Sequence, residues 1–230
     1  MPNPGSLGYC YNIKYYKHSK DNAFPAGNFH TPVEFLEFEE GFNSTIKLWR
    51  NYVGGDESDV TFHVKKIKLP NSLTQINNYA FSGYKALNEI NIPNSVLSIG
   101  EQAFFQCVSL KELAIPSSVQ SMYVNALQFC RGLKYLKIPA NLYLLTTSNI
   151  NPINIFCKGL NSLQKIDIDG GWVPSVDVDF SDSKNLSKES FIDFGNKLGN
   201  GNRIITYPAG MSLTNSEKLI FTNKGYILTQ

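Results

Sequence analysis

The sequence predicts an α/β-type repeat solenoid, a protein in which short and similar coils stack along one axis. Two observations predict it. Pro70, Pro93, Pro116 and Pro139 follow one another at intervals of 23 residues, and the residues around them repeat one pattern of apolar and polar types. A unit of this length cannot bury an apolar face by itself, whereas stacked copies cover one another and share a continuous core.

Each repeat is predicted to open with a short strand. An apolar residue starts the unit and a second follows two positions later, which places both on one side of an extended chain. The proline then ends the strand and turns the chain. The pairs are Ile67 with Leu69, Ile90 with Ile92, Leu113 with Ile115, and Leu136 with Ile138. Further apolar columns close each unit, among them Tyr84, Cys107 and Cys130.

The repeat pattern divides the chain into three parts. Clear 23-residue repeats cover 67–139, and a 30-residue unit covers 139–169 because 146–155 contains an insertion. With a degenerate first strand at 33–38 and an irregular coil over 39–63, the solenoid is predicted to span 33–172. Residues 1–32 are expected to form an N-terminal cap or arm over the first coil, since the terminal repeats of a solenoid need capping.

Residues 173–230 are predicted to form a helix-strand-helix-strand cap that continues the solenoid. Ser187 is a helix N-cap and Gly199 ends that helix. Thr214 and Glu217 form a capping box that opens a second helix. Strands are predicted over 203–207 and 226–228. The interval of 22 residues from Ile205 to Ile227 indicates that the repeat continues in altered form.

The repeats resemble a known family. The pattern I-x-I-P-x-S-V-x-x-I-x-x-x-A-F-x-x-C-x-x-L at a 23-residue period, seen over 67–172, resembles the BspA-type (treponemal-type) leucine-rich repeats of bacterial surface proteins. The resemblance implies a right-handed coil with a short parallel sheet on its concave face, a helical or irregular convex side, and terminal caps. It also implies adhesion or partner binding, with no shared enzyme activity.

Composition and charge exclude several classes of protein. Apolar residues make up 42% and charged residues 17% of the chain, which is enough for a packed core. The formal net charge of +2 comes without a basic run, so nucleic acid is not an expected partner. No apolar stretch is long enough to span a membrane. The N-terminal residues lack the apolar segment of a signal peptide.

The residues offer little catalytic or metal-binding chemistry. The three histidines are not at metal-ligand spacing with a second histidine or a cysteine. Cys107 and Cys130 share a column, which allows a disulfide but favours two free core thiols. Asp177 and Asp179 resemble the start of a calcium loop, but the required glycine and glutamate are missing. No metal, cofactor or catalytic residue is therefore predicted, and an enzyme using Asp177, Asp179 and Glu189 is a minor alternative.

The predicted partner-binding site is the outward face of the strands. Residues that alternate with the core positions form two columns of mixed charge, which is typical of a surface that binds protein. The columns are Lys66, Glu89, Glu112, Tyr135 and Lys165, and Lys68, Asn91, Ala114, Lys137 and Asp167. Two alternatives stay open: these residues are simply solvated, or binding uses Trp49, Trp172 and the N-terminal tyrosines. Trp172 could equally belong to the core.

The function predicted from these features is a non-catalytic, protein-binding or adhesion module of a bacterial surface or secreted protein. Its partner would be a host or bacterial protein at the cell surface or outside the cell. The alternative is a structural or decoration protein of a larger assembly, such as a phage particle, which would place the chain in the virion.

Overall fold

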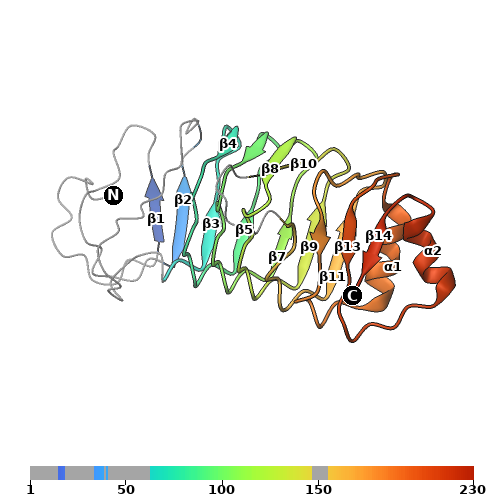
Figure 1. Ribbon diagram of the computed structural model, residues 1–230. Coiled ribbons are helices and arrows are strands. Elements are labelled where there is room, and N and C mark those ends of the chain that lie inside the picture. The colour runs from blue at the N-terminus through green and yellow to red at the C-terminus, as the bar shows by residue number, and fades with distance from the viewer. Residues whose placement is uncertain (1–14, 19–33, 39, 41–62, 147–154) are drawn as a thin grey trace, which may run out of the picture.

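The described residues form an elongated stack of coils, with β1 at one end and the C-terminus at the other (Figure 1). The computed structural model describes residues 15–18, 34–38, 40, 63–146 and 155–230. The predicted cap residues other than 15–18, the irregular coil with Trp49, and most of the insertion at 146–155 lie outside these residues. Strands stand side by side along the stack, and the two helices lie together at its C-terminal end.

The main row of strands runs along one side of the stack and is parallel throughout. It consists of two hydrogen-bonded sheets, β1-β2-β3-β5 and β7-β9-β11. The predicted repeat openings and the degenerate first strand all lie in this row. The strands are β1 (Tyr15–His18), β2 (Phe35–Phe38), β3 (Lys66–Lys68), β5 (Glu89–Asn91), β7 (Glu112–Ala114), β9 (Tyr135–Ile138) and β11 (Lys165–Ile168).

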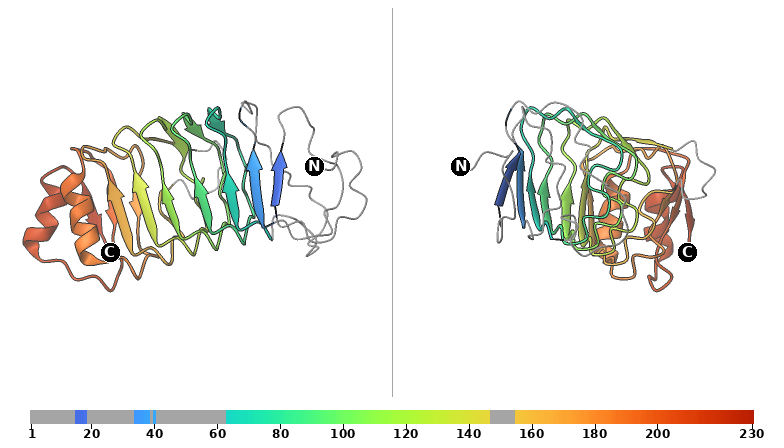
Figure 2. Two further views of the ribbon diagram at one scale, coloured as in Figure 1. Left: turned by 180° about the vertical axis from the view of Figure 1, so that it is seen from behind. Right: turned by 90° about the vertical axis from the view of Figure 1, so that its left-hand side faces the viewer.

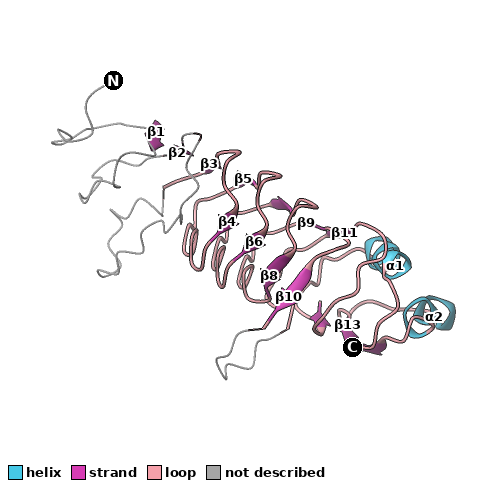
Figure 3. Cartoon of the chain, turned by 90° about the horizontal axis from the view of Figure 1, so that it is seen from above, coloured by secondary structure: helices cyan, strands magenta, loops and turns pink. Residues whose placement is uncertain are grey.

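A second row of short strands lies behind the main row, as the view from above shows (Figure 3). These strands pair in parallel in the order β10-β8-β6-β4, and the sequence analysis did not predict them. They are only two or three residues long, so each presents a single core residue and no alternating pattern. Their bounds are β4 (Gln75–Ile76), β6 (Ser98–Ile99), β8 (Ser121–Tyr123) and β10 (Tyr143–Leu145).

The core lies between the rows and is built from the repeating apolar columns. Ile67, Ile90, Leu113 and Leu136 are all at most 4% exposed. The turns between the two rows also form backbone hydrogen bonds with the turns of the neighbouring coil. For example, the Phe81 N–H donates to the Ala103 carbonyl at 2.7 Å, and the Phe104 N–H donates to the Ala126 carbonyl at 2.9 Å. The irregular side of each coil therefore satisfies its backbone groups in the neighbouring coil.

The C-terminal segment begins with a short strand, β12, that the sequence analysis did not predict, and a helix, a strand, a helix and a strand follow it. Helix α1 (Lys188–Lys197) starts at the N-cap Ser187, and α2 (Asn215–Thr222) starts at a complete Thr214–Glu217 capping box. The strands are β12 (Val178–Asp179), β13 (Ile204–Thr206) and β14 (Ile227–Thr229), paired in parallel in that order. Ile205 pairs with Leu228, not with Ile227, so the interval here is the full repeat of 23 residues.

Helix α1 covers the open edge of the main row. The Ser190 hydroxyl accepts a hydrogen bond from the Ile166 N–H at 2.9 Å and donates one to the Ile166 carbonyl at 3.0 Å. The backbone N–H and C=O of Ile166 on the edge strand β11 are therefore satisfied by a helix side chain where another strand would otherwise add. The rear view shows α1 at this end of the row (Figure 2). Phe191 and Phe194, which belong to α1, are fully buried on its inner face.

Candidate functional site

The structure places the ten predicted binding residues along the outward side of the main row, which we call the strand face. In β3, β5 and β7 the flanking residues are exposed and the central residue is buried, as predicted. Strand pairing aligns the two columns. Lys66 pairs with Glu89, and Lys68 with Asn91. Tyr135 pairs with both Glu112 and Lys165, and Lys137 with both Ala114 and Asp167.

The strand face is interrupted between β5 and β7. Among the described residues, these two neighbouring strands belong to different hydrogen-bonded sheets. A shallow depression of about 490 Å³ lies at the interruption. It is lined by Asn88, Glu89, Ile90, Asn91, Lys111, Glu112, Ala114 and Tyr135. Glu89 and Glu112 occupy the same column on either side, and like charges on neighbouring strands destabilise their pairing.

The C-terminal part of the strand face is occupied by its own interactions. The Lys197 ammonium of α1 contacts an Asp167 carboxylate oxygen at 2.7 Å, and the Tyr135 hydroxyl donates to the other oxygen at 3.5 Å. The bond from Lys197 lowers the pKa of the Asp167 carboxyl despite partial burial. The Lys165 ammonium lies 5.5 Å from the centre of the Tyr135 ring. Asp167 therefore holds the helix on the sheet.

The N-terminal part also pairs its charges, with one exception. Lys66 forms an ion pair with Glu89, and Lys68 forms one with Glu37 at 2.9 Å. Glu112 is exposed and has no ion-pair partner among the described residues. Within the strand face, Glu112 at the depression is thus the carboxylate left to pair with a basic group from outside.

The other candidates from the sequence are structural. Trp172 is fully buried, and its indole N–H donates to the Leu142 carbonyl at 2.9 Å, so the core alternative for this residue is confirmed. Cys107 and Cys130 are free and buried, as favoured from the sequence. Their thiols donate to the carbonyls of Phe81 and Phe104 at 3.1 and 3.0 Å. Burial raises the pKa of the Cys130 thiol to about 12.

The aspartates of the calcium-like segment bind protein groups. Asp177 accepts a hydrogen bond from the Ile204 N–H at 2.9 Å, and Asp179 accepts one from the Lys158 ammonium at 3.1 Å. Burial alone would raise the pKa of the Asp179 carboxyl, but hydrogen bonds from Ser181 and Lys158 outweigh it and lower that pKa. Within the described ranges there is no cluster of three or more residues able to hold a metal ion. No described helix is long and apolar enough to cross a membrane.

One column on the irregular side departs from ordinary backbone geometry, a feature that sequence reasoning missed. Gly83, Gln106, Phe129 and Gly159 occupy equivalent positions in successive coils and all have φ between 58° and 82°. This left-handed region suits glycine and is uncommon for a bulky side chain. The sequence did contain a signal for this geometry. Glycine at the equivalent position of two coils, Gly83 and Gly159, indicates a left-handed backbone there, and Gln106 and Phe129 adopt it without being glycine.

Comparison with known proteins agrees with this repeat geometry. Residues 59–170 match the family of BspA type leucine-rich repeat regions, in six copies. The chain carries a BspA-type leucine-rich repeat region. The resemblance seen in the sequence is thereby confirmed, and so is the repeat-solenoid fold. The matched residues include every strand of the main row from β3 to β11 and hence the whole depression. No curated protein matches the chain at a significant level.

Several solved structures of bacterial leucine-rich proteins are similar to this chain. A leucine-rich repeat protein of T. pallidum has a TM-score of 0.50 at 17% identity, over 74% of this chain and 72% of that one. A leucine-rich repeat protein of Bacteroides ovatus has a TM-score of 0.46 at 21% identity, over 78% and 44%. A leucine-rich cell surface protein of Faecalibacterium prausnitzii has a TM-score of 0.43 at 20% identity, over 69% and 33%. The chain spans less than half the length of the last two.

Proposed function

We propose that the chain is a non-catalytic protein-binding module that engages its partner through the strand face at the depression between β5 and β7. The observation that supports this most directly is the exposed Glu112, which lacks an ion-pair partner within the described residues and lies beside the half-buried ring of Tyr135. Tyrosine is enriched among the residues that dominate interface binding energy, and a carboxylate beside it would add specificity through charge complementarity.

The partner that fits this depression is a protein surface with a basic side chain beside an apolar one. The basic group would pair with Glu112, and the apolar group would lie over Ala114 and against Tyr135. The other charges of the strand face form ion pairs within the chain, except Lys165, whose ammonium lies over the Tyr135 ring, so they would form the polar rim of the interface. The BspA-type repeats support a location at a bacterial surface or outside the cell, with adhesion as the role of the module.

The test is a pull-down from host and bacterial surface extracts with wild type and with a Glu112→Lys, Tyr135→Ala double variant. A matched control changes the same two residue types elsewhere. Tyr143 on β10 and Glu189 on α1 are both exposed, so the control is Tyr143→Ala with Glu189→Lys. Circular dichroism verifies that all three proteins are folded.

The proposal expects a protein that wild type and the control capture and that the double variant loses. Capture by all three proteins would move binding away from the strand face. Absence of any captured protein would instead support the structural role in a larger assembly. The surface location is tested separately, by protease treatment of intact cells, which should remove the chain from the cell surface.

A further inference from the structure

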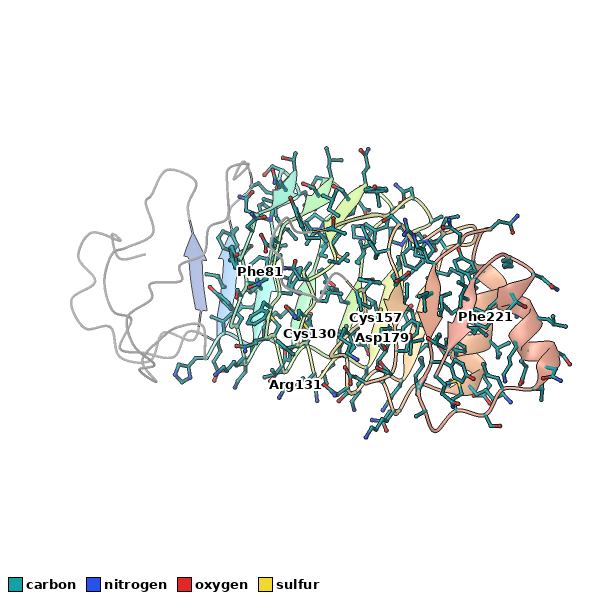
Figure 4. The ribbon with its side chains drawn as sticks, viewed as in Figure 1. Phe81, Cys130, Arg131, Cys157, Asp179 and Phe221 are labelled. Atoms are coloured by element: carbon teal, nitrogen blue, oxygen red, sulfur yellow. The ribbon has the colours of Figure 1, made fainter. Side chains whose placement is uncertain are left out.

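A second exposed surface lies along the turns that lead into the main row, and we call it the aromatic ridge. It consists of Phe105, Val108, Phe129 and Arg131 from two successive coils. The rings of Phe105 and Phe129 meet edge to face with their centres 5.5 Å apart. Both rings are partly exposed, and Val108 is 37% exposed. Arg131 lies at the lower edge of the stack (Figure 4).

The backbone at Phe129 is held in a conformation that a phenylalanine disfavours. Its φ is 61°, in the column where Gly83 and Gly159 occupy the equivalent positions with φ of 82° and 81°. The ring packs beside Gly159 of the next coil, where a Cβ would lie 3.3 Å from a Phe129 ring carbon. Tyr79, Gln102, Gln106 and Cys157 also have positive φ, and Phe129 differs from them in carrying a partly exposed ring that packs on a second ring, Phe105. Strain of this kind is concentrated at functional sites.

Arg131 is oriented by the ridge and has no acidic partner. Its guanidinium carbon lies 5.5 Å from the centre of the Phe129 ring. A guanidinium stacked on a ring keeps the donors at its edge available for a carboxylate. Within the described part of the chain, no acidic side chain forms an ion pair with Arg131.

Two further lysines, Lys111 and Lys134, lie in the segments that lead from these turns into β7 and β9. The Lys134 N–H donates to the Lys111 carbonyl at 2.7 Å, so these residues lie on adjacent coils. Both side chains are exposed, and neither forms an ion pair with a described residue. Lys111 also lines the depression of the strand face, so the cation that the ridge itself holds against a ring is Arg131. Aromatic residues and arginine dominate the binding energy of protein interfaces.

We propose that the aromatic ridge is a second protein-binding surface that takes an acidic peptide segment bearing a large apolar side chain. The apolar side chain packs on the rings of Phe105 and Phe129, and a neighbouring carboxylate pairs with Arg131. The charge of this surface is opposite to that of Glu112 at the depression, so the two surfaces select different partners. Phe105, Val108, Phe129 and Arg131 do not line the depression, so either surface could bind without the other.

The test uses a random library of twelve-residue peptides displayed on phage and selected on the wild-type chain. Peptides that bind the ridge should be enriched in Asp or Glu next to Phe, Trp, Leu or Ile. Their affinities are then measured by fluorescence anisotropy on wild type, Phe129→Gly and Arg131→Glu. We expect each variant to weaken binding by about tenfold or more, since both change groups of the hot-spot type.

Two control variants distinguish binding at the ridge from binding elsewhere on the chain. Gln106→Gly changes the same column without touching a ring, and Glu112→Lys changes the strand face, so both should bind the peptides as wild type does. Phe129→Gly suits the left-handed backbone and is expected to fold. Arg131→Glu alters only an exposed side chain, so it tests the ridge even if the glycine variant is unstable.

Three results would overturn the proposal. They are failure to select any peptide, selection of peptides without acidic residues, and equal affinity for wild type and both ridge variants. Peptides lost on Glu112→Lys but kept on Phe129→Gly would overturn the ridge while supporting the strand face.

Discussion

Replacing Gln106 with glycine should stabilise the protein, because it removes backbone strain without removing a packed side chain. Gln106 has φ of 58° and only partial burial, and it lies in the column of Gly83 and Gly159. A left-handed conformation costs an ordinary residue about 1–2 kcal/mol. Glycine avoids that cost but loses about 0.5–1 kcal/mol in backbone entropy on folding. The expected net gain in the free energy of unfolding is therefore about 0.5–1 kcal/mol.

Thermal unfolding followed by circular dichroism measures this gain. For a chain of this length, 1 kcal/mol corresponds to about 2–4 °C in Tm, so Gln106→Gly should raise Tm by about 1–4 °C. Gln106→Ala keeps the strain and should give no increase. Gly83→Ala is the reverse change, since its new Cβ would meet nothing within 4 Å while φ stays at 82°. It should lower stability by about 1 kcal/mol. Equal Tm values for Gln106→Gly and Gln106→Ala would refute the strain argument.

Three further predictions concern the core and its charged edge. Trp172→Phe should lower the free energy of unfolding by roughly 2–4 kcal/mol in urea titrations, because it leaves a buried carbonyl unpaired and a small cavity. The stability advantage of wild type over Asp179→Asn should be present at pH 7 and lost as pH falls below about 4. The sign follows because the folded state lowers the pKa of Asp179. In a Cys10→Ser background, Cys107 and the other buried thiols should react with a thiol reagent only as the protein unfolds, since burial raises their pKa.

The sequence predicted the repeat, the main row of strands and the C-terminal elements because each has a local chemical signature. Alternating Ile and Leu beside a proline marks a strand, and Thr214 with Glu217 marks a helix start. The second row lacked such a signature, since a strand such as Gln75–Ile76 has one core residue and pairs only through neighbours 23 residues away. The role of Ser190 in covering β11 was hidden for the same reason, because it depends on a contact across 24 residues.

For the binding columns, too, the sequence predicted what depends on neighbouring residues and missed what depends on contacts between residues far apart in the chain. Alternation along each strand predicted which side chains face outward, and the pairing registers agree with it. Alternation does not reveal which of those side chains are already occupied. Asp167 was as plausible a contact as Glu112 until Lys197, on a helix 30 residues away, was found bound to it. The interruption between β5 and β7 likewise depends on two strands that each look regular by themselves.

Both proposed surfaces draw on one coil, the repeat that runs from Glu112 to Lys134. In a stacked repeat, a column is shaped mainly by packing against its two neighbours, so a residue that matches its column is accounted for by the core alone. This coil carries the small residue Ala114 in a column otherwise made of lysine, asparagine and aspartate, and it carries Phe129 in a left-handed position that Gln106 shares in the preceding coil. Neither departure improves the core. A selective pressure other than folding is the simplest physical reason for both, and binding at two sides of one coil would supply it.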